Sequence, residues 1–287
     1  MLKKVRSYLP EKFRDQSITV PVVKLQGAIG MSTPMRQGLS LSAVSRQLDK
    51  AFAHKDAPAV VLIVNSPGGS PVQSRLIFQR IRDLAEEKEK EVLVFVEDVA
   101  ASGGYMIAVA GDEIIVDPSS VVGSIGVVAA GFGFTELLKK IGVERRVYTA
   151  GEKKVTLDPF QEENAEDIEY LKGLQQEIHD TFIDLVKGRR ADVLSDSSEI
   201  FSGKFWTGKR AVELGLADEL GDLRGTLRKR FGDKVKPKLI SAPRNMFGRR
   251  VGSGVEAILG NVSPISGVGE ELISTVEERS LWARYGL

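Results

Sequence analysis

The stretch Asp98–Tyr105 (DVAASGGY) places Ser102 after a predicted strand and its short linker, at the predicted start of a helix. Helix N-termini carry free N–H groups and positive partial charge, so an oxyanion formed by attack of this serine would lie beside ready donors. The glycines at 103 and 104 let a substrate backbone approach, because they lack a Cβ atom. A serine that only caps a helix fits the same pattern, and this stretch alone favours that structural role.

A catalytic serine needs a proton acceptor, and this chain offers few. It has no cysteine and only two histidines, His54 and His179, each on a helical stretch where a surface or packing role is expected. The loop 149–159 (TAGEKKVTLDP) contributes Lys153 and Lys154 instead. Taken alone, either lysine is an ordinary solvated charge.

A lysine acts as a base only in its neutral form. The reference pKa of lysine is about 10.4, so fewer than about one lysine in a thousand is neutral at pH 7. Burial in an apolar pocket lowers this pKa by several units. We therefore expect a catalytic lysine to become buried, above all when substrate excludes water, and a hydroxyl group to orient it. Ser124, in the sequence VGSIGV, is the candidate for that hydroxyl.

A second glycine-rich loop, 65–69 (NSPGG), also follows a buried apolar run. At the carboxyl end of a parallel strand, such a loop can offer backbone N–H groups to an oxyanion. It can equally hold a phosphate, although neither G-x-G-x-x-G nor a Walker sequence is present. An ordinary strand-to-helix turn explains the loop taken by itself.

The elements that must position these residues alternate along the chain. Apolar, β-branched runs predict strands over 19–25, 59–64, 92–96 and 113–116, with an extended segment over 145–148. Helical spacing predicts helices over 41–54, 72–87, 102–110, 135–141, 162–190 and 270–284. This alternation favours an α/β domain with a largely parallel sheet over 19–240. A basic arm over 1–18 precedes it, and a tail with a final helix follows over 241–287.

Composition excludes several classes of function. The 287 residues are 42% hydrophobic and 28% charged, with a net charge of +1, so no global field attracts nucleic acid. The absence of cysteine removes thiol nucleophiles, disulfides and thiolate metal sites. No apolar run reaches the roughly 18 to 20 residues of a membrane-spanning helix. We expect a cytoplasmic protein, with peripheral contact of the basic arm to the inner membrane as an alternative.

Taken in order, these motifs resemble the signal peptide peptidase A (SppA/SohB-type) family of Ser/Lys-dyad peptidases, in the ClpP/crotonase superfamily. The matching pieces are NSPGG, VLVFV, DVAASGGYMIAVAGDEIIVDP, VGSIGV, TAGEKKVTLDP, FSG at 201–203 and AVELGLADELG at 211–221. They cover most of the chain. The resemblance implies a ClpP/crotonase-like fold of repeated ββα units, with a mostly parallel sheet and flanking helices. It also implies a peptidase domain over 19–240.

The resemblance also implies roles for individual residues. Ser102 matches the nucleophile, and Lys154 rather than Lys153 matches the general base, because Pro159 sets the register of the loop. Ser124 matches a serine that orients the lysine.

The same resemblance implies an oxyanion hole and a substrate groove. The N–H group of Gly69 would join that of Ser102 or Gly103 in the oxyanion hole. Gly68, Gly126 and Val127 would contact a peptide bound as an added strand, with small or aliphatic side chains favoured. No metal and no cofactor is implied, and homo-oligomeric rings or domes are expected.

We therefore predict a serine endopeptidase that hydrolyses cleaved signal peptides or other small peptides through an acyl-enzyme. Many family members carry an N-terminal membrane span that this sequence lacks, and this is a single-repeat form, so neighbouring subunits would complete each site. One alternative is a crotonase-type acyl-CoA enzyme that uses Glu97 or Asp98 near the same loop. Another is an inactive oligomeric scaffold.

Overall fold

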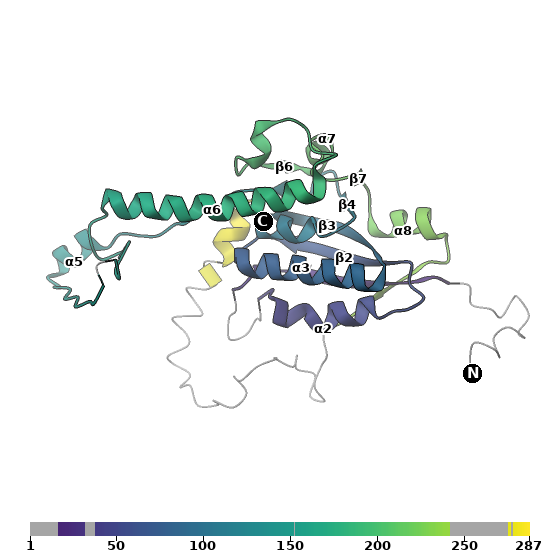
Figure 1. Ribbon diagram of the computed structural model, residues 1–287, viewed down its shortest axis with the longest axis horizontal. Helices are drawn as coiled ribbons and strands as arrows, with labels where there is room; N and C mark the ends of the chain where they lie inside the picture. Colours follow the sequence, from purple (N-terminus) through teal and green to yellow (C-terminus); the bar gives the residue numbers. More distant parts are fainter. Residues whose placement is uncertain (1–16, 32–37, 152, 242–274, 277) are drawn as a thin grey trace, which may run out of the picture.

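The computed structural model describes residues 17–31, 38–151, 153–241, 275–276 and 278–287 (Figure 1). Most of the predicted arm over 1–18 and most of the predicted tail over 241–287 lie outside these residues, so both domain boundaries remain predictions. Within the described ranges, no helix is long and apolar enough to cross a bilayer.

An eight-stranded sheet forms the centre of the described part of the chain. Its strands follow the order β6-β5-β3-β2-β1-β8, while β4 pairs with β3 and β7 pairs with β4. Every pairing is parallel except that of β5 with β6, which confirms the expected α/β class with a mostly parallel sheet. The strands are Thr19–Gln26 (β1), Ala59–Ser66 (β2), Glu91–Ala101 (β3), Glu113–Val116 (β4), Val121–Gly123 (β5), Phe205–Thr207 (β6), Glu219–Leu220 (β7) and Lys236–Leu239 (β8).

Helices cover both faces of this sheet. Alternate residues of β2 point to opposite sides: Val60 and Leu62 pack with α2, α3, α4 and α6, whereas Val61 packs with Leu227 of α8. Strands buried on both faces read as continuous apolar runs, and each such side chain contributes about 1.5–3 kcal/mol by leaving water. The helices are Leu41–Phe52 (α2), Pro71–Lys88 (α3), Gly103–Ala108 (α4), Thr135–Ile141 (α5), Ala165–Arg190 (α6), Gly208–Glu213 (α7) and Leu223–Phe231 (α8), with a 3₁₀ turn over Ser198–Phe201.

Strand β3 is longer than its apolar run predicts, and it changes partner midway. Its first half pairs with β4 over 93–96, and its second half pairs with β5 over 99–101. Glu97 and Asp98 lie at the change of partner with exposed side chains, so these charges interrupt the apolar pattern without ending the strand. β3 therefore runs to Ala101, one residue before the candidate nucleophile.

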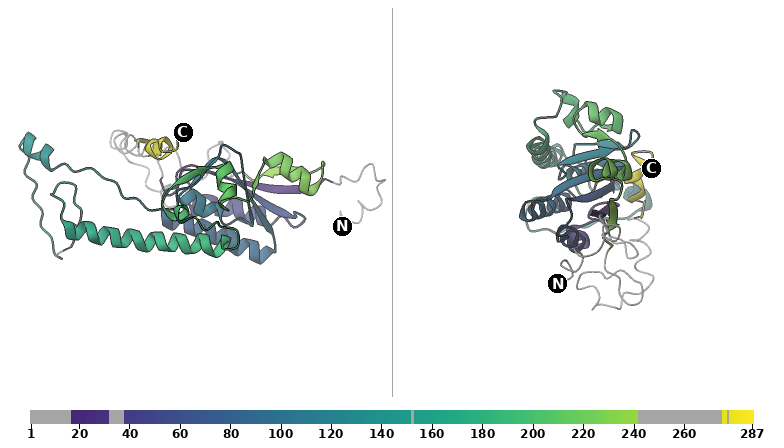
Figure 2. Two further views of the ribbon diagram at one scale, coloured as in Figure 1. Left: turned by 90° about the horizontal axis from the view of Figure 1, so that it is seen from above. Right: turned by 90° about the vertical axis from the view of Figure 1, so that its right-hand side faces the viewer.

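Helix α6 extends well beyond the sheet, and α5 with the loop after it lies at the far end, as both figures show (Figures 1 and 2). We call residues 126–164 the arm from here on; this segment is separate from the basic N-terminal residues 1–18. The buried residues of α6 are confined to its second half, and α5 has none. α6 begins at Ala165, because the side chain of Asn164 caps it by accepting the N–H of Asp167. Residues 145–148, predicted as an extended segment, join no strand of the sheet, and most of them are exposed.

Candidate active site

Ser102 occupies a sharp turn between β3 and α4. Its backbone has φ +51° and ψ −123°, a conformation that non-glycine residues rarely adopt and that costs on the order of 1–3 kcal/mol. The turn persists because its N–H group donates to the carbonyl of Gly123 at 2.8 Å, continuing the pairing of β3 with β5. The half-buried side chain is thus carried by well-fixed backbone at the carboxyl edge of the sheet.

The NSPGG loop lies directly against this serine. A Cβ atom on Gly68 would lie 2.8 Å from the Cβ of Ser102 and 3.0 Å from the amide nitrogen of Gly103. Gly68 and Gly69 both have positive φ, +103° and +139°, so the loop requires glycine twice. The adjacent strands β2 and β3 therefore bring Gly68, Gly69, Ser102 and Gly103 together, as the sequence predicts for the carboxyl edge of a parallel sheet.

Two backbone N–H groups at this edge are available for an oxyanion. Among the described residues, the N–H groups of Gly69 and Gly103 form no hydrogen bond. The N–H of Ser102 is already donated to Gly123, so of the two alternatives left open by the sequence, Gly103 is the free donor. Paired N–H donors beside a nucleophile are the arrangement that stabilises a tetrahedral intermediate.

The two glycines after Ser102 are required by close packing within the protein, a role that the sequence did not suggest. A Cβ on Gly103 would lie 2.3 Å from Oγ of Ser74, and one on Gly104 would lie 2.4 Å from the carbonyl oxygen of Ser66. Both glycines thus allow α4 to pack against α3 and the end of β2. Close packing within the protein, rather than access for substrate, is what these contacts require.

Ser124 lies beside this site because Ala101 of β3 pairs with Gly123 of β5. Ser124 also has a positive φ of +54°, and its N–H donates to the carbonyl of Lys204 at 2.7 Å. Its hydroxyl oxygen accepts a hydrogen bond from the hydroxyl of Tyr285 at 3.3 Å.

Tyr285 follows the final helical stretch of the chain and makes a second contact at the site. Its ring packs edge-on against Phe205 of β6, with ring centroids 5.1 Å apart. The end of the chain thus contacts Ser124, the serine predicted to orient the lysine. Sequence reasoning identified neither aromatic residue, since no local pattern links positions so far apart in the chain.

Lys154 is not near Ser102 in this single chain. It is exposed in the loop between α5 and α6, and Figure 1 shows this loop at the end of the arm remote from the sheet. Within the part of the chain that the structure describes, its ammonium group forms no hydrogen bond or ion pair. The burial expected of a lysine base is therefore not present in the isolated chain.

Lys153 differs from its neighbour. It forms ion pairs with Glu166 at 2.9 Å and with Asp167 at 3.7 Å. The hydrogen bond that Lys153 donates to Glu166, with the charges of both carboxylates, raises the pKa of Lys153 and so favours its protonated form. This pairing keeps Lys153 in its protonated form, in which its nitrogen has no lone pair to accept a proton.

The predicted substrate residues Gly126 and Val127 begin a segment with unpaired backbone. Over 126–133, the described backbone forms no hydrogen bond with any other described residue, and most of these residues are exposed. One contact holds the start of the segment: Nε2 of His179 on α6 lies 3.1 Å from the carbonyl oxygen of Ile125. His179 thus packs near the site without reaching Ser102.

Glu97 and Asp98, the two carboxylates that an acyl-CoA enzyme could use here, both form contacts with other side chains. Glu97 forms an ion pair with Lys24 at 2.8 Å, and Asp98 accepts a hydrogen bond from Asn65 at 2.7 Å. Within the described ranges, no group of three or more His, Cys, Asp or Glu side chains is placed to bind a metal.

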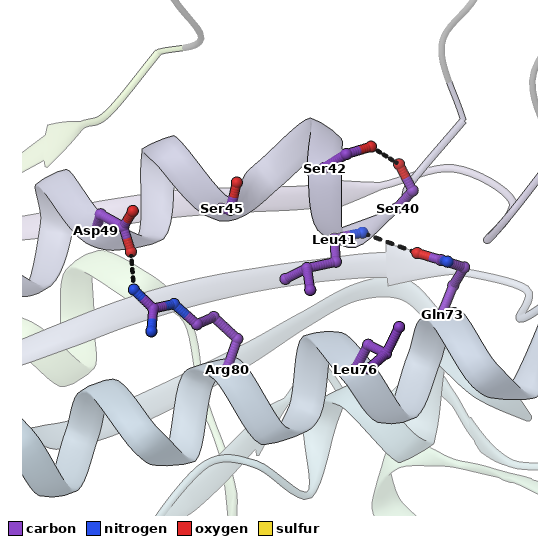
Figure 3. Close-up of a pocket in the computed structure, with 8 residues that line it drawn as sticks. All are labelled: Ser40, Leu41, Ser42, Ser45, Asp49, Gln73, Leu76 and Arg80. Atoms are coloured by element: carbon purple, nitrogen blue, oxygen red, sulfur yellow. Dashed lines mark hydrogen bonds and ion pairs between the residues drawn. The ribbon is translucent and has the colours of Figure 1, made fainter. Parts of the chain in front are cut away.

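A cavity of about 570 Å³ lies elsewhere, between α2 and α3 (Figure 3). Several of its polar groups pair with one another: Arg80 pairs with Asp49 at 2.6 Å, and Oε1 of Gln73 accepts the N–H of Leu41 at 3.0 Å. It contains none of the residues that the motifs single out.

Comparison with known proteins identifies the family. A model described as peptidase family S49 matches residues 85–233, just over half of the chain. A protein of Brucella abortus named Na(+)/H(+) antiporter NhaA is 61% identical over 288 residues, which cover 99% of this chain and 39% of that protein. Protease 4 of Haemophilus influenzae is 30% identical over 229 residues, covering 77% of this chain and 36% of that protein.

Two further similarities were found. The chloroplastic serine protease SPPA of Arabidopsis thaliana is 30% identical over 216 residues, covering 73% of this chain and 31% of that protein. The chain thus spans less than half the length of each of these three relatives. A solved variant of the 1510-N membrane-bound stomatin-specific protease in complex with a substrate peptide has 15% identity and a TM-score of 0.45, over 79% of this chain and 94% of that chain. The family model and the related proteases confirm the resemblance seen in the motifs: the chain belongs to peptidase family S49.

Proposed function

We propose that the protein is a serine endopeptidase in which Ser102 is the nucleophile and Lys154 is the general base. The observation that carries this proposal is the position of Ser102, on a strained turn between the free N–H groups of Gly69 and Gly103. A carbonyl carbon attacked by this serine would have its oxygen between two donors. Each such donor contributes about 3–4 kcal/mol to lowering the barrier.

The reaction then proceeds in two halves. Oγ of Ser102 attacks the scissile carbonyl, its proton passes to the neutral amine of Lys154, and the oxyanion accepts hydrogen bonds from the two glycine N–H groups. As the C–N bond breaks, the lysine ammonium protonates the leaving amine, and an ester to Ser102 remains. Water, deprotonated by the same lysine, attacks the ester; as the ester bond breaks, the lysine ammonium returns the proton to Oγ of Ser102 and the acid product leaves.

Lys154 of the same chain does not lie beside Ser102, and we propose that a neighbouring copy supplies the lysine to each Ser102. The arm carries exposed apolar side chains: Phe132 is 81% exposed, Ile141 60% and Tyr148 90%. Phe134 and Phe160 stack at 5.4 Å, and Arg145 lies over Phe160. Exposed apolar clusters of this kind typically mark protein contacts. A second copy docked on this arm would also exclude water from Lys154, which is the condition for its neutral form.

The substrate is proposed to be a peptide in extended form beside residues 126–133. The unpaired backbone there offers the hydrogen bonds that an added strand requires. Gly126 and Val127 lie at its start, next to Ser124, and favour small or aliphatic substrate side chains. Cleaved signal peptides and other small peptides fit this description equally.

Tyr285 is hydrogen-bonded to the hydroxyl of Ser124, the group that this mechanism assigns to orienting Lys154. In the resting chain, Oγ of Ser124 accepts its hydrogen bond from Tyr285. In the active assembly, Lys154 takes that place, so the C-terminal helix must withdraw from Ser124.

Cleavage of a library of unstructured peptides tests the proposal, with Ser102→Ala, Lys154→Met and Lys153→Met variants in parallel. The first two should fall to background while remaining folded, and Lys153→Met should retain activity because Lys153 is paired on the arm. Mixing the two inactive variants should restore about a quarter of the activity, because half of the copies supply a serine and half supply a lysine. Activity in the unmixed Ser102→Ala or Lys154→Met variant would refute the dyad. Absence of restoration would refute the contribution of a neighbouring copy.

A further inference from the structure

We propose that Ser66 is a positioning residue that orients the Gly69 oxyanion donor; this inference rests on the proposed peptidase function. Ser66 is the last residue of β2 and is completely buried. Its hydroxyl donates to the carbonyl of Gly27 at 2.7 Å and accepts the N–H of Gly68 at 3.2 Å. One hydroxyl thus serves as donor and acceptor at once, between the end of β1 and the oxyanion loop.

The loop is held from its other side by Ile29. The N–H of Ile29 donates to the carbonyl of Gly68 at 2.8 Å, and its carbonyl accepts the N–H of Ser70 at 2.8 Å. Gly68 is therefore anchored at both its N–H and its C=O. Because the peptide between Gly68 and Gly69 is planar and trans, holding the Gly68 carbonyl on Ile29 aims the Gly69 N–H the opposite way.

Two glycines in succession would otherwise leave this peptide plane free to rotate. Gly68 and Gly69 have φ values of +103° and +139°, and glycine crosses this region with little steric resistance. Ile29 holds one end of the Gly68 residue and Ser66 holds the other. Removal of the Ser66 hydroxyl would free the Gly68 N–H, and with it the orientation of the next peptide.

Ser66 also contacts the helix that carries the second donor. A Cβ on Gly104 would lie 2.4 Å from the carbonyl oxygen of Ser66 and 3.2 Å from its Cβ. A Cβ on Gly68 would lie 3.0 Å from the Gly103 nitrogen. Ser66 therefore touches both elements that supply oxyanion donors, and its position sets the spacing between them.

A purely structural role would produce a different result, and Ser120 provides the matched comparison. Ser120 is also buried, 2% exposed, and its hydroxyl also bridges two backbone groups of this sheet. It donates to the carbonyl of Glu97 at 2.6 Å and accepts the N–H of Asp117 at 3.1 Å. The Ser120 hydroxyl also lies 3.3 Å from the carbonyl oxygen of Val96. Both serines are thus buried and each hydroxyl is both donor and acceptor to backbone groups, but only Ser66 contacts the loop of Gly69.

The test compares Ser66→Ala and Ser120→Ala in the full chain. Both variants should lose similar thermal stability. Ser66→Ala alone should lower kcat by about 10- to 100-fold, part of the loss seen when a whole oxyanion donor is removed, with KM within about twofold. It should weaken binding of a peptide boronate, which forms a tetrahedral adduct, by the same factor. Ser66→Cys, which fills the site with a weaker hydrogen-bonding group, should lie between the wild type and Ser66→Ala.

Hydrogen–deuterium exchange over residues 66–70 provides a readout independent of catalysis. The amides of this loop should exchange faster in Ser66→Ala and at the wild-type rate in Ser120→Ala. Equal kcat and boronate affinity in the two alanine variants would overturn the inference, as would unchanged exchange in the loop. If the wild type neither cleaves peptides nor binds the boronate, the proposed function fails, and the exchange data alone decide whether Ser66 holds the loop.

Discussion

The substitution Gly103→Ala adds a methyl group at the tight contact between α4 and α3, and so tests that contact. Gly103 has a backbone that alanine can adopt, but its Cβ would lie 2.3 Å from Oγ of Ser74 and 3.3 Å from Cδ1 of Ile29. Ser74 is completely buried, and its hydroxyl donates to the carbonyl of Ser70 at 2.8 Å. The hydroxyl therefore cannot rotate away without losing that hydrogen bond.

The contact gives the expected magnitude of Gly103→Ala. Overpacking a filled core costs about 1–3 kcal/mol, and losing the Ser74 hydrogen bond adds about 1 kcal/mol. We expect a loss of about 2–4 kcal/mol in the free energy of unfolding. If α4 shifts to relieve the collision, the N–H of Gly103 moves with it, and kcat should fall toward the loss of about 10²–10³-fold that removal of one oxyanion donor causes.

Urea denaturation of wild type, Gly103→Ala, Ser74→Ala and the double variant measures this effect. Removal of Oγ in Ser74→Ala opens space for the new methyl group, so the double variant should recover at least half of the loss. Gly173→Ala is the control: position 173 is on α6 with no atom within 4 Å of its Cβ, and alanine there should stabilise the helix by about 1 kcal/mol. Wild-type stability and kcat in Gly103→Ala would refute the packing argument. Simple additivity of the two single substitutions would show that Ser74 is not the group in collision.

Two further substitutions test other contacts. Tyr285→Phe removes the hydrogen bond to Ser124 while keeping the ring against Phe205. It should raise kcat/KM several-fold in a peptide-cleavage assay, while Tyr170→Phe on the exposed face of α6 should have no effect; equal activities would show that Tyr285 does not compete with the lysine. Arg190→Met breaks a buried ion pair with Asp218 and a hydrogen bond to the carbonyl of Gly215, and should cost about 3–5 kcal/mol in urea denaturation. Arg146→Met, which breaks an exposed pair, should cost less than about 1 kcal/mol, and a similarly small loss in Arg190→Met would contradict the argument.

Local pattern was sufficient for the elements with a strong periodic signal. The helix over 135–141 and the strand over 113–116 were predicted with the bounds that the structure has. The short strands β5, β6 and β7 were not predicted, because two or three residues carry no periodic signal, and β8 (KPKL) was not predicted because it lacks the apolar run that marks β4. Their pairing depends on tertiary contacts, such as that of Gly123 with Phe205 across β5 and β6.

The serine half of the site was predictable for a topological reason. Two glycine-containing loops that follow adjacent parallel strands must meet at the same edge of a sheet, so Gly69 and Ser102 had to lie close together. What the sequence could not reveal was which N–H groups remain free. That depends on the bond from Ser102 to Gly123, which forms only because β3 changes partner at Glu97 and Asp98.

The position of Lys154 relative to Ser102 could not be predicted by the same reasoning. The physical cause also bears on how the activity of the protein would be controlled. Ser102 is positioned by backbone hydrogen bonds within one sheet, whereas Lys154 is attached to an exposed arm with few contacts to the core. A lysine in water keeps its proton at neutral pH and cannot act as a base. On the proposed mechanism, the contact that brings Lys154 to Ser102 of another copy would be the same event that removes water and lowers its pKa. Proximity and basicity would then arise together on assembly, so an isolated chain would carry a prepared serine but no base.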